Sequence, residues 1–302
     1  MIMSIAAILE SCNPVFNAIR RQDTAARKTD HKNPVSAMIS EDLLYGQQWL
    51  SQPGIDTLRL RANDGASLQG YYRPALLKSD KLAILIHGYR ADARMMAKYA
   101  DLYRAWGYNV FMADNRGHGH SGGAYVGMGW LDRLDYQQWL QLLLTRYGNA
   151  QQVVIHGISM GASAALMMSG ENTLPPQVKA IVADCGFTNA YAQFRYLMGH
   201  QYHIPAFPLL NLADKTARKK AGYSLKEADA LGQVRKTQVP ILFIHGAADD
   251  NNPVSMVYEL YGASAGPKKL LIIPQARHAM SFHDAPDLYR NTVKDFLSAY
   301  IH

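Results

Sequence analysis

The sequence is poor in cysteine and in charged residues. Its 302 residues include only two cysteines, Cys12 and Cys185, which lie far apart and have no metal-ligand spacing. A disulfide framework and a metal site are therefore not expected. Charged residues make up 18% of the chain and hydrophobic residues 48%, which excludes a disordered or low-complexity protein. The chain is long enough to bury a sizeable core, so we expect an ordinary globular protein.

A long hydrophobic run is also absent. The apolar stretch of residues 1–9 is interrupted at Glu10, lacks a cationic leader and is far shorter than the about 18 residues of a membrane span. Glu10 also fits poorly before a lipidated Cys12. We therefore predict a cytoplasmic protein with no transmembrane segment.

Basic residues exceed acidic residues by 31 to 24, which gives a net charge of +7. Part of this excess lies in residues 201–240, but no nucleic-acid-binding motif or interleaved aromatic pattern accompanies it. We interpret the basic residues there as a solvated helix face and expect no nucleic-acid partner.

The chain divides into two parts. Residues 1–52 mix short apolar clusters with a polar stretch and end near the turn signal Gln52-Pro53-Gly54, so we expect a helical lead-in. Residues 53–302 form the main domain, in which short apolar runs alternate with longer amphipathic stretches. This alternation is typical of βαβ units and predicts a mainly parallel sheet.

Eight of the short runs are predicted strands. Two of them, 57–61 and 68–72, flank the hairpin signal Asn63-Asp64-Gly65 and should open the sheet as an antiparallel pair. The others are continuously apolar, as in strands buried on both faces: 82–86, 109–113, 153–156, 180–183, 241–244 and 270–273. Helices long enough for crossovers are expected at 92–106, 130–147, 160–169, 254–263 and 285–300. The fold class is α/β, a mostly parallel eight-stranded sheet with helices on both faces.

The connection between Ala183 and Ile241 is far longer than an ordinary link in such a fold. We expect it to hold a small helical lid, at about residues 187–235, inserted after the sixth strand. Its aromatic-rich first half supplies three candidate substrate-binding residues, Tyr191, Phe194 and Met198. The same side chains could equally form an aromatic mini-core.

One motif carries a specific chemistry. Gly157-Ile158-Ser159-Met160-Gly161 matches G-x-S-x-G, and it lies between a predicted strand and a predicted helix. In this strand-turn-helix context the serine occupies a strained turn, so its neighbours must be small. Ser159 is therefore the candidate nucleophile.

A serine nucleophile needs a base, and the base needs a carboxylate to orient it. Asp249 and His278 follow two later strands, and the carboxyl ends of parallel strands meet at one edge of the sheet. They are the candidate acid and base. Asp184 also ends a strand, but we expect it to accept hydrogen bonds from loop N–H groups or to cap the next segment. His283 competes with His278, and its distance from the last strand disfavours it.

The developing oxyanion needs two N–H donors, one from the residue after the nucleophile and one from the loop after the third strand. We assign the backbone N–H groups of Met160 and Tyr89 to this role. Tyr89 is also a candidate substrate-binding residue. The remaining histidines of the strand ends are interpreted as structural, and no metal site is expected: His87, His118, His120, His156 and His245.

Several motifs in the same order resemble the α/β-hydrolase superfamily from about Thr57 to the end: His87-Gly88, the run from Asp114 to Ser121, the Ser159 turn, His245-Gly246-Ala247-Ala248-Asp249, and His278-Ala279-Met280. The spacing within the fourth motif selects Asp249 over Asp250. Within the superfamily the chain resembles bacterial cell-surface-type serine esterases, which are lysophospholipase-like or cinnamoyl-esterase-like. Such relatives can be located at the cell surface.

These residues predict a serine carboxylesterase that hydrolyses esters of small to medium acyl or aryl groups through an acyl-enzyme intermediate. The partner is a small-molecule ester, and no cofactor is required. An acyltransferase, thioesterase, lysophospholipase or peptidase would use the same three residues, and a non-catalytic binding protein on this fold is the remaining alternative. The sequence leaves open whether the protein forms a homodimer.

Overall fold

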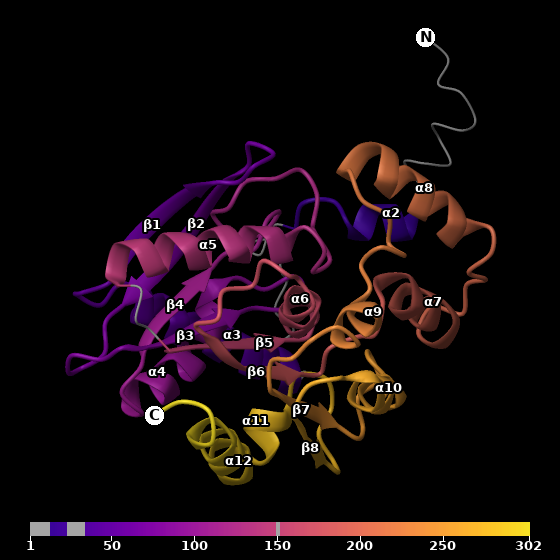
Figure 1. The fold of residues 1–302 in the computed structure, drawn as a ribbon. Helices are drawn as coiled ribbons and strands as arrows, with labels where there is room; N and C mark the ends of the chain where they lie inside the picture. The colour runs from indigo at the N-terminus through magenta and orange to yellow at the C-terminus, as the bar shows by residue number, and fades with distance from the viewer. Residues whose placement is uncertain (1–12, 23–33, 149–151) are drawn as a thin grey trace.

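The computed structural model describes residues 13–22, 34–148 and 152–302, and an eight-stranded sheet lies at the centre of this part of the chain (Figure 1). Its strand order is β1-β2-β4-β3-β5-β6-β7-β8. β1 and β2 form an antiparallel hairpin and β2 pairs antiparallel with β4, whereas β3 to β8 pair in parallel. The strands are β1 (Asp56–Arg61), β2 (Ser67–Arg73), β3 (Lys81–Ile86), β4 (Asn109–Ala113), β5 (Gln152–Ile158), β6 (Val178–Asp184), β7 (Ile241–Gly246) and β8 (Lys268–Ile273).

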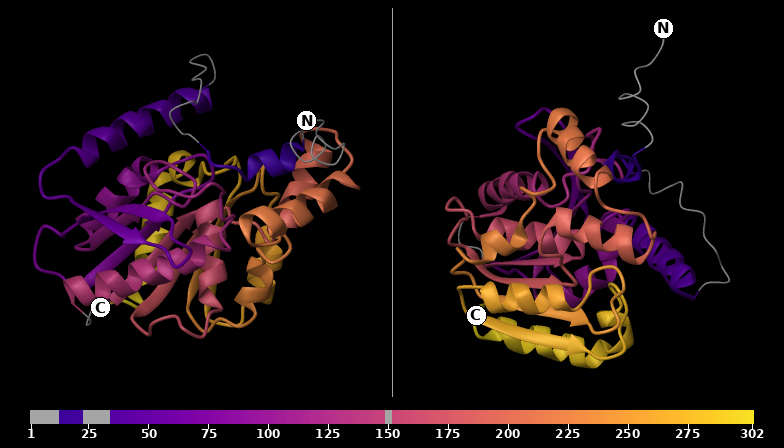
Figure 2. Two further views of the ribbon diagram at one scale, coloured as in Figure 1. Left: turned by 90° about the horizontal axis from the view of Figure 1, so that it is seen from above. Right: turned by 90° about the vertical axis from the view of Figure 1, so that its right-hand side faces the viewer.

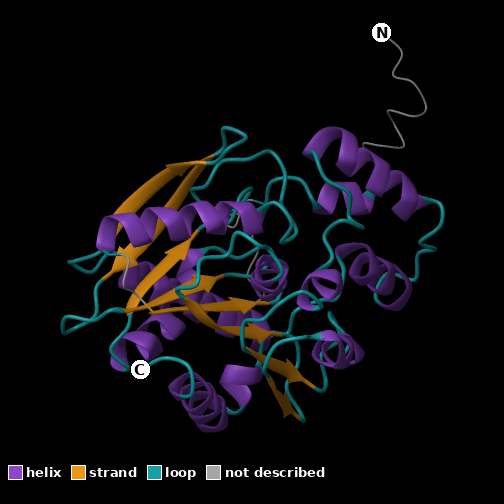
Figure 3. Ribbon diagram, in the orientation of Figure 1, coloured by secondary structure: helices purple, strands orange, loops and turns teal. Residues whose placement is uncertain are grey.

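Helices cover both faces of this sheet, because the alternating side chains of its central strands are apolar on each side (Figures 1 and 3). Ile84 of β3 belongs to the larger core, and its neighbour Leu85 belongs to the second core on the opposite face. The larger core includes α5 (Asp132–Tyr147), α6 (Met160–Ser169) and α10 (Ser255–Ala263). The second includes residues of α3 (Pro34–Leu50), η2 (Ala93–Met96), α4 (Ala97–Ala105) and α12 (Pro286–Ser298).

The fold predicted from the sequence is confirmed. Each predicted strand overlaps an observed one, and the helices predicted at 130–147, 160–169, 254–263 and 285–300 correspond to α5, α6, α10 and α12. The helix predicted at 92–106 begins instead with the 3₁₀ turn η2, which is capped by the Asp92 side chain, and continues as α4. A further short helix, α11 (Ser281–Asp284), precedes α12.

The long connection between β6 and β7 is helical. It contains α7 (Ala190–His200), α8 (Leu209–Ala221) and α9 (Ala230–Val234). Phe194 and Met198 are one helical turn apart on α7 and are buried in the larger core. These side chains thus form the mini-core that the sequence left open, and the role of the insertion as a lid stays a prediction.

The described part of the N-terminal region forms two helices in different places. α2 (Pro14–Ala18) lies beside α8 of the insertion (Figure 1), and the Asn13 side chain donates a 2.9 Å hydrogen bond to the Leu209 carbonyl. α3 packs against η2 and α4 on the other side of the molecule (Figure 2). The predictions for residues 1–9 and Cys12 lie outside the described residues. None of the helices described has the length and apolar character needed to cross a membrane.

Candidate active site

Ser159 lies on a sharp turn between β5 and α6. Its backbone has a φ of 55°, a left-handed conformation that is strained for a residue with a side chain. The glycines of the motif permit this turn, because a Cβ on Gly157 would lie 2.2 Å from the Gly161 carbonyl oxygen, and one on Gly161 would lie 2.1 Å from that of Ile86. Small residues are therefore required here by the packing of α6 on β3 and β5.

His278 connects Ser159 to Asp249. Its Nε2 lies 2.9 Å from the Ser159 Oγ, and its Nδ1 lies 2.8 Å from the Asp249 Oδ2. Asp249 follows β7 and His278 follows β8, so the three residues meet at the carboxyl edge of the sheet. If Nδ1 carries the proton that Asp249 accepts, Nε2 is left to accept the proton of the serine hydroxyl.

The Asp249 carboxylate is held from several sides. Its Oδ1 accepts hydrogen bonds from the backbone N–H groups of Asn251, at 2.9 Å, and Asn252, at 2.8 Å. The buried His245 places its Nε2 3.3 Å from the Asp249 Oδ2. Burial alone would raise the pKa of Asp249, but the hydrogen bonds from His245, His278 and Asn252 outweigh it and hold this pKa below its ordinary value. Asp249 is thus a carboxylate at neutral pH.

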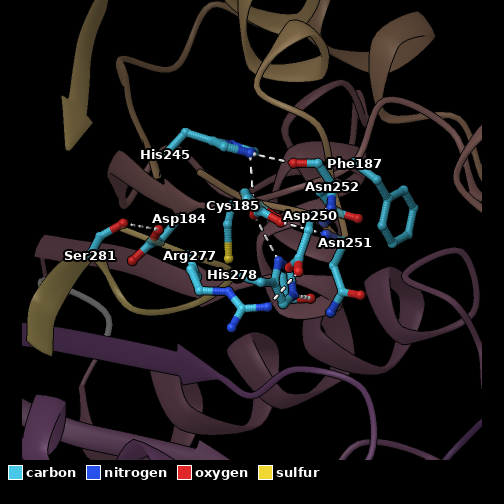
Figure 4. Close-up of polar contacts among 12 residues, drawn as sticks. Asp184, Cys185, Phe187, His245, Asp250, Asn251, Asn252, Arg277, His278 and Ser281 are labelled. Atoms are coloured by element: carbon cyan, nitrogen blue, oxygen red, sulfur yellow. Dashed lines mark hydrogen bonds and ion pairs between the residues drawn. The ribbon is translucent and has the colours of Figure 1, made fainter. Parts of the chain in front are cut away.

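Asp250, Asp184 and His283, the alternatives to Asp249 and His278 in the sequence, have other partners. Asp250 pairs with Arg277 at 2.5 Å beside His278 (Figure 4), and His283 pairs with Asp284 at 2.9 Å. Asp184 is buried, but the hydrogen bonds that its side chain accepts within the described structure come from the hydroxyl groups of Ser281 and Tyr289, not from loop N–H groups as expected. Burial raises the pKa of Asp184 to about 6.

The proposed oxyanion donors flank the nucleophile. Met160 is the first residue of α6, where backbone N–H groups have no acceptor within the helix. On the other side, a Cβ on Gly88 would lie 3.3 Å from the Ser159 Cβ, so the loop that continues into Tyr89 passes directly beside the serine. The Tyr89 hydroxyl points away and donates a 2.7 Å hydrogen bond to the Ala18 carbonyl.

A buried histidine fixes this loop. His87 Nε2 accepts a 2.9 Å hydrogen bond from the Asn115 N–H, so its Nδ1, 2.7 Å from the Gly88 carbonyl oxygen, carries the proton and donates it there. Burial lowers the pKa of His87 and favours this neutral form. His118 and His156 are likewise hydrogen-bonded within the interior, and Asp114 accepts bonds from the N–H groups of two loops, in agreement with a scaffold role.

A cavity of about 440 Å³ opens beside the nucleophile. Ser159, His278 and Tyr89 line it, whereas Tyr191, Phe194 and Met198 are not among its lining residues. The insertion contributes Gln201, whose side chain donates to the Asp250 carbonyl at 3.0 Å and to the Asn251 side chain at 2.8 Å.

Most of the apolar wall of this cavity was missed from the sequence. It comes from the N-terminal helix, from the segment before α4 and from the strand and loop ends near the serine: Met38, Ile39, Met95, Met96, Tyr99, Ile158, Ala279 and Met280. Of these, Ile158, Ala279 and Met280 belong to motifs identified in the sequence, and nothing in the sequence indicates that residues before position 50 reach the site.

One set of donor atoms near the site has the composition of metal ligands. The ligand atoms of Cys185, Asp249 and His278 lie within 4.8 Å of one another. However, Asp249 and His278 bind each other, and burial raises the pKa of the Cys185 thiol well above its ordinary value, which opposes formation of the thiolate that a metal needs. This arrangement favours a hydrolase site over a metal centre.

Known proteins are similar to this chain in sequence and in structure. A model of the prolyl oligopeptidase family matches residues 94–302. The uncharacterized protein YqkD of Bacillus subtilis is 34% identical over 233 residues, which cover 77% of this chain and 76% of the relative.

Two solved structures show the same fold at low sequence identity. The esterase Pf2001 of Pyrococcus furiosus is similar with a TM-score of 0.66 at 23% identity, covering 87% of this chain and 95% of the esterase. The acylaminoacyl peptidase of Pyrococcus horikoshii gives a TM-score of 0.59 at 17% identity, covering 84% of this chain and 42% of the peptidase. The architecture is that of the α/β hydrolases.

Proposed function

The chain belongs to the prolyl oligopeptidase family and is a serine hydrolase of the α/β-hydrolase fold, and from this premise we propose that it is a carboxylesterase with Ser159 as its nucleophile. The observation that carries the proposal is the continuous hydrogen-bonded chain from Ser159 through His278 to Asp249, at 2.9 and 2.8 Å, at the wall of a cavity. The substrates are carboxylic esters with small to medium acyl or aryl groups.

The reaction proceeds in two halves. In the first, His278 removes the proton of the Ser159 hydroxyl as its Oγ attacks the ester carbonyl, and then gives that proton to the departing alcohol. In the second, a water loses its proton to His278 and attacks the acyl-enzyme, which releases the acid and restores Ser159. The N–H groups of Tyr89 and Met160 hold the oxyanion in both halves. Asp249 orients His278 and stabilises its charged form.

The charges around the cavity favour an ester over a peptide with a free N-terminus. A site for such a peptide needs an unpaired carboxylate to bind the terminal ammonium group. The two carboxylates that line the described cavity are Asp42 and Asp250. Asp42 is paired with Lys98 and Asp250 with Arg277, so neither charge is left for a peptide terminus.

A peptidase is the second candidate, because the family model is named after a peptidase and the acylaminoacyl peptidase of Pyrococcus horikoshii shares the fold. An N-acylated peptide carries no terminal ammonium group, so the lack of an unpaired carboxylate does not disfavour it as a substrate. Hydrolysis of N-acyl amino acid amides, measured beside that of esters with the same acyl group, decides between the two.

The test of the proposal is hydrolysis of p-nitrophenyl esters of increasing acyl length by the wild type and by Ser159→Ala, with fluorophosphonate labelling in parallel. We expect the substitution to abolish labelling and to lower kcat by several orders of magnitude, because the three residues act as a unit. A wild-type protein that neither labels nor hydrolyses any ester of the series would overturn the proposal in favour of a binding protein on this fold.

A further inference from the structure

The cavity beside Ser159 is closed on one side by α3, a helix that precedes the hydrolase fold in the sequence. We propose that α3 forms the distal wall of the acyl pocket and that Met38 and Ile39 set the length of acyl chain it accepts. This inference rests on the proposed esterase function and adds the substrate class: esters whose acyl group is an unbranched aliphatic chain of medium length, bound between α3 and α4.

The chemistry of the lining residues supports an aliphatic acyl group. α3 contributes Met38 and Ile39, and η2 and α4, on which α3 packs, contribute Met95, Met96 and Tyr99. Methionine side chains are unbranched and flexible, so they adapt to a chain that itself has many conformations. A wall of this kind binds an acyl chain mainly through apolar contact.

The polar lining residues come from other elements than α3, η2 and α4. Gln201, Asn251 and the Asp250–Arg277 pair come from the insertion and from the loops that carry Asp249 and His278. We assign the apolar residues of α3, η2 and α4 to the acyl chain and these polar residues to the alcohol that leaves. Asp42 of α3 also lines the cavity, and its charge is neutralised by Lys98 of α4.

α3 is fixed to the body of the molecule by the half that follows the cavity. Trp49 is buried, and its Nε1 donates a 2.7 Å hydrogen bond to Asp101 of α4, which also accepts one from the Tyr45 hydroxyl. At Gly46, α3 comes so close to η2 that a Cβ would lie 2.1 Å from the Arg94 carbonyl oxygen. This anchoring fixes α3, and with it Met38 and Ile39, on η2 and α4 beside the cavity.

The experiment compares kcat/KM for p-nitrophenyl acetate and decanoate in full-length variants. Ile39→Trp fills the distal end of the pocket, and we expect it to lower the decanoate-to-acetate ratio about tenfold. Met38→Ala enlarges the pocket and is expected to raise the decanoate-to-acetate ratio. Leu44→Ala is the matched control, because Leu44 is on the same helix, is 58% exposed and does not line the cavity.

Gly46→Ala tests the anchoring, with Gly262→Ala of α10 as its control, because a Cβ on Gly262 meets nothing within 4 Å. We expect Gly46→Ala to lower the decanoate-to-acetate ratio while acetate is still hydrolysed, and Gly262→Ala to leave the ratio as in the wild type. An unchanged ratio in Ile39→Trp, Met38→Ala and Gly46→Ala would overturn the role of α3.

A second readout separates this inference from the proposed function. Sodium decanoate, the product acid, should raise the Tm of the wild type and of Leu44→Ala but not that of Ile39→Trp. If decanoate has this effect although no ester is hydrolysed, the acyl pocket stands and the esterase proposal fails. If esters are hydrolysed but decanoate stabilises Ile39→Trp as it does the wild type, the acyl pocket is wrong and the esterase proposal stands.

Discussion

His245 Nε2 lies 3.3 Å from Asp249 Oδ2, the same oxygen that binds His278 Nδ1. His245 and Asp249 lie in the same turn, which begins near the end of β7 and continues to Asn252. The Asn252 carbonyl oxygen lies 2.8 Å from His245 Nε2. This Nε2 is therefore protonated, and its N–H is directed at both acceptors. His245 is buried and does not line the cavity, so any effect on the reaction acts through the position of Asp249.

Replacing His245 should slow the chemical step without weakening substrate binding. We expect His245→Leu to lower kcat about tenfold with little change in KM, because a hydrogen bond to a charged group contributes about 1.5–3 kcal/mol. His245→Gln keeps an N–H donor and should restore part of the loss. Steady-state kinetics on one p-nitrophenyl ester measures both. His156→Leu removes a comparably buried histidine distant from Asp249, and equal losses of kcat in the two leucine variants would contradict the positioning role.

The Tyr89 side chain tests whether the oxyanion donor is a main-chain group. Tyr89→Phe keeps the backbone N–H and the ring but loses the hydrogen bond to Ala18. We expect the free energy of unfolding to fall by about 1 kcal/mol and kcat to change only a few-fold. Urea unfolding and steady-state kinetics provide the two values. A loss of kcat of about 10² to 10³, as for removal of an oxyanion donor, would assign that role to the hydroxyl instead.

Asp184 should make the free energy of unfolding fall as the pH rises through its pKa. A paired carboxylate, whose pKa is lowered on folding, has the opposite effect. Burial raises its pKa in the folded protein to about 6 from the ordinary 3.8, so the folded state holds a proton that the unfolded state has lost. The wild type therefore loses about 3 kcal/mol of unfolding free energy from this group as the pH rises from about 4 to above 6. Asp184→Asn removes that loss.

The measurement is urea unfolding of both proteins at several pH values, read as the difference between them. Asp132, whose pKa burial also raises to about 6, is present in both proteins and largely cancels. As the pH rises across this range, the free energy of unfolding of Asp184→Asn should increase relative to that of the wild type. A difference independent of pH would show that the Asp184 carboxyl is not protonated in the folded protein.

The close approach at Gly161 predicts a strong effect of one methyl group. Gly161→Ala brings a Cβ to 2.1 Å from the Ile86 carbonyl oxygen, so α6 must move away from β3. We expect a loss of about 3 kcal/mol in unfolding free energy, together with loss of esterase activity as Ser159 moves. Gly262→Ala should be as stable as the wild type or slightly more so. Chemical denaturation and activity at one ester concentration check both.

The order and type of most elements were determined by the sequence alone. The continuous apolar runs at 82–86 and 153–156 are buried on both faces of a parallel sheet, the environment of which such runs are typical. Ser159 was predicted as the nucleophile for a local reason: the strand, the tight turn and the helix of the motif are consecutive in the chain. Asp249 and His278 followed because loops at the carboxyl ends of parallel strands share one edge.

Only the tertiary structure decided what surrounds the candidate site. Phe194 and Met198 read equally well as pocket or as core, since both environments are apolar, and the packing of α7 buried them in the core. Met38 and Ile39 reach the cavity because α3 docks on η2 and α4 through Gly46 and Trp49. That contact joins segments about 50 residues apart. The hydrophobic pattern within each segment predicts its own helix, but it does not predict that the two helices pack together.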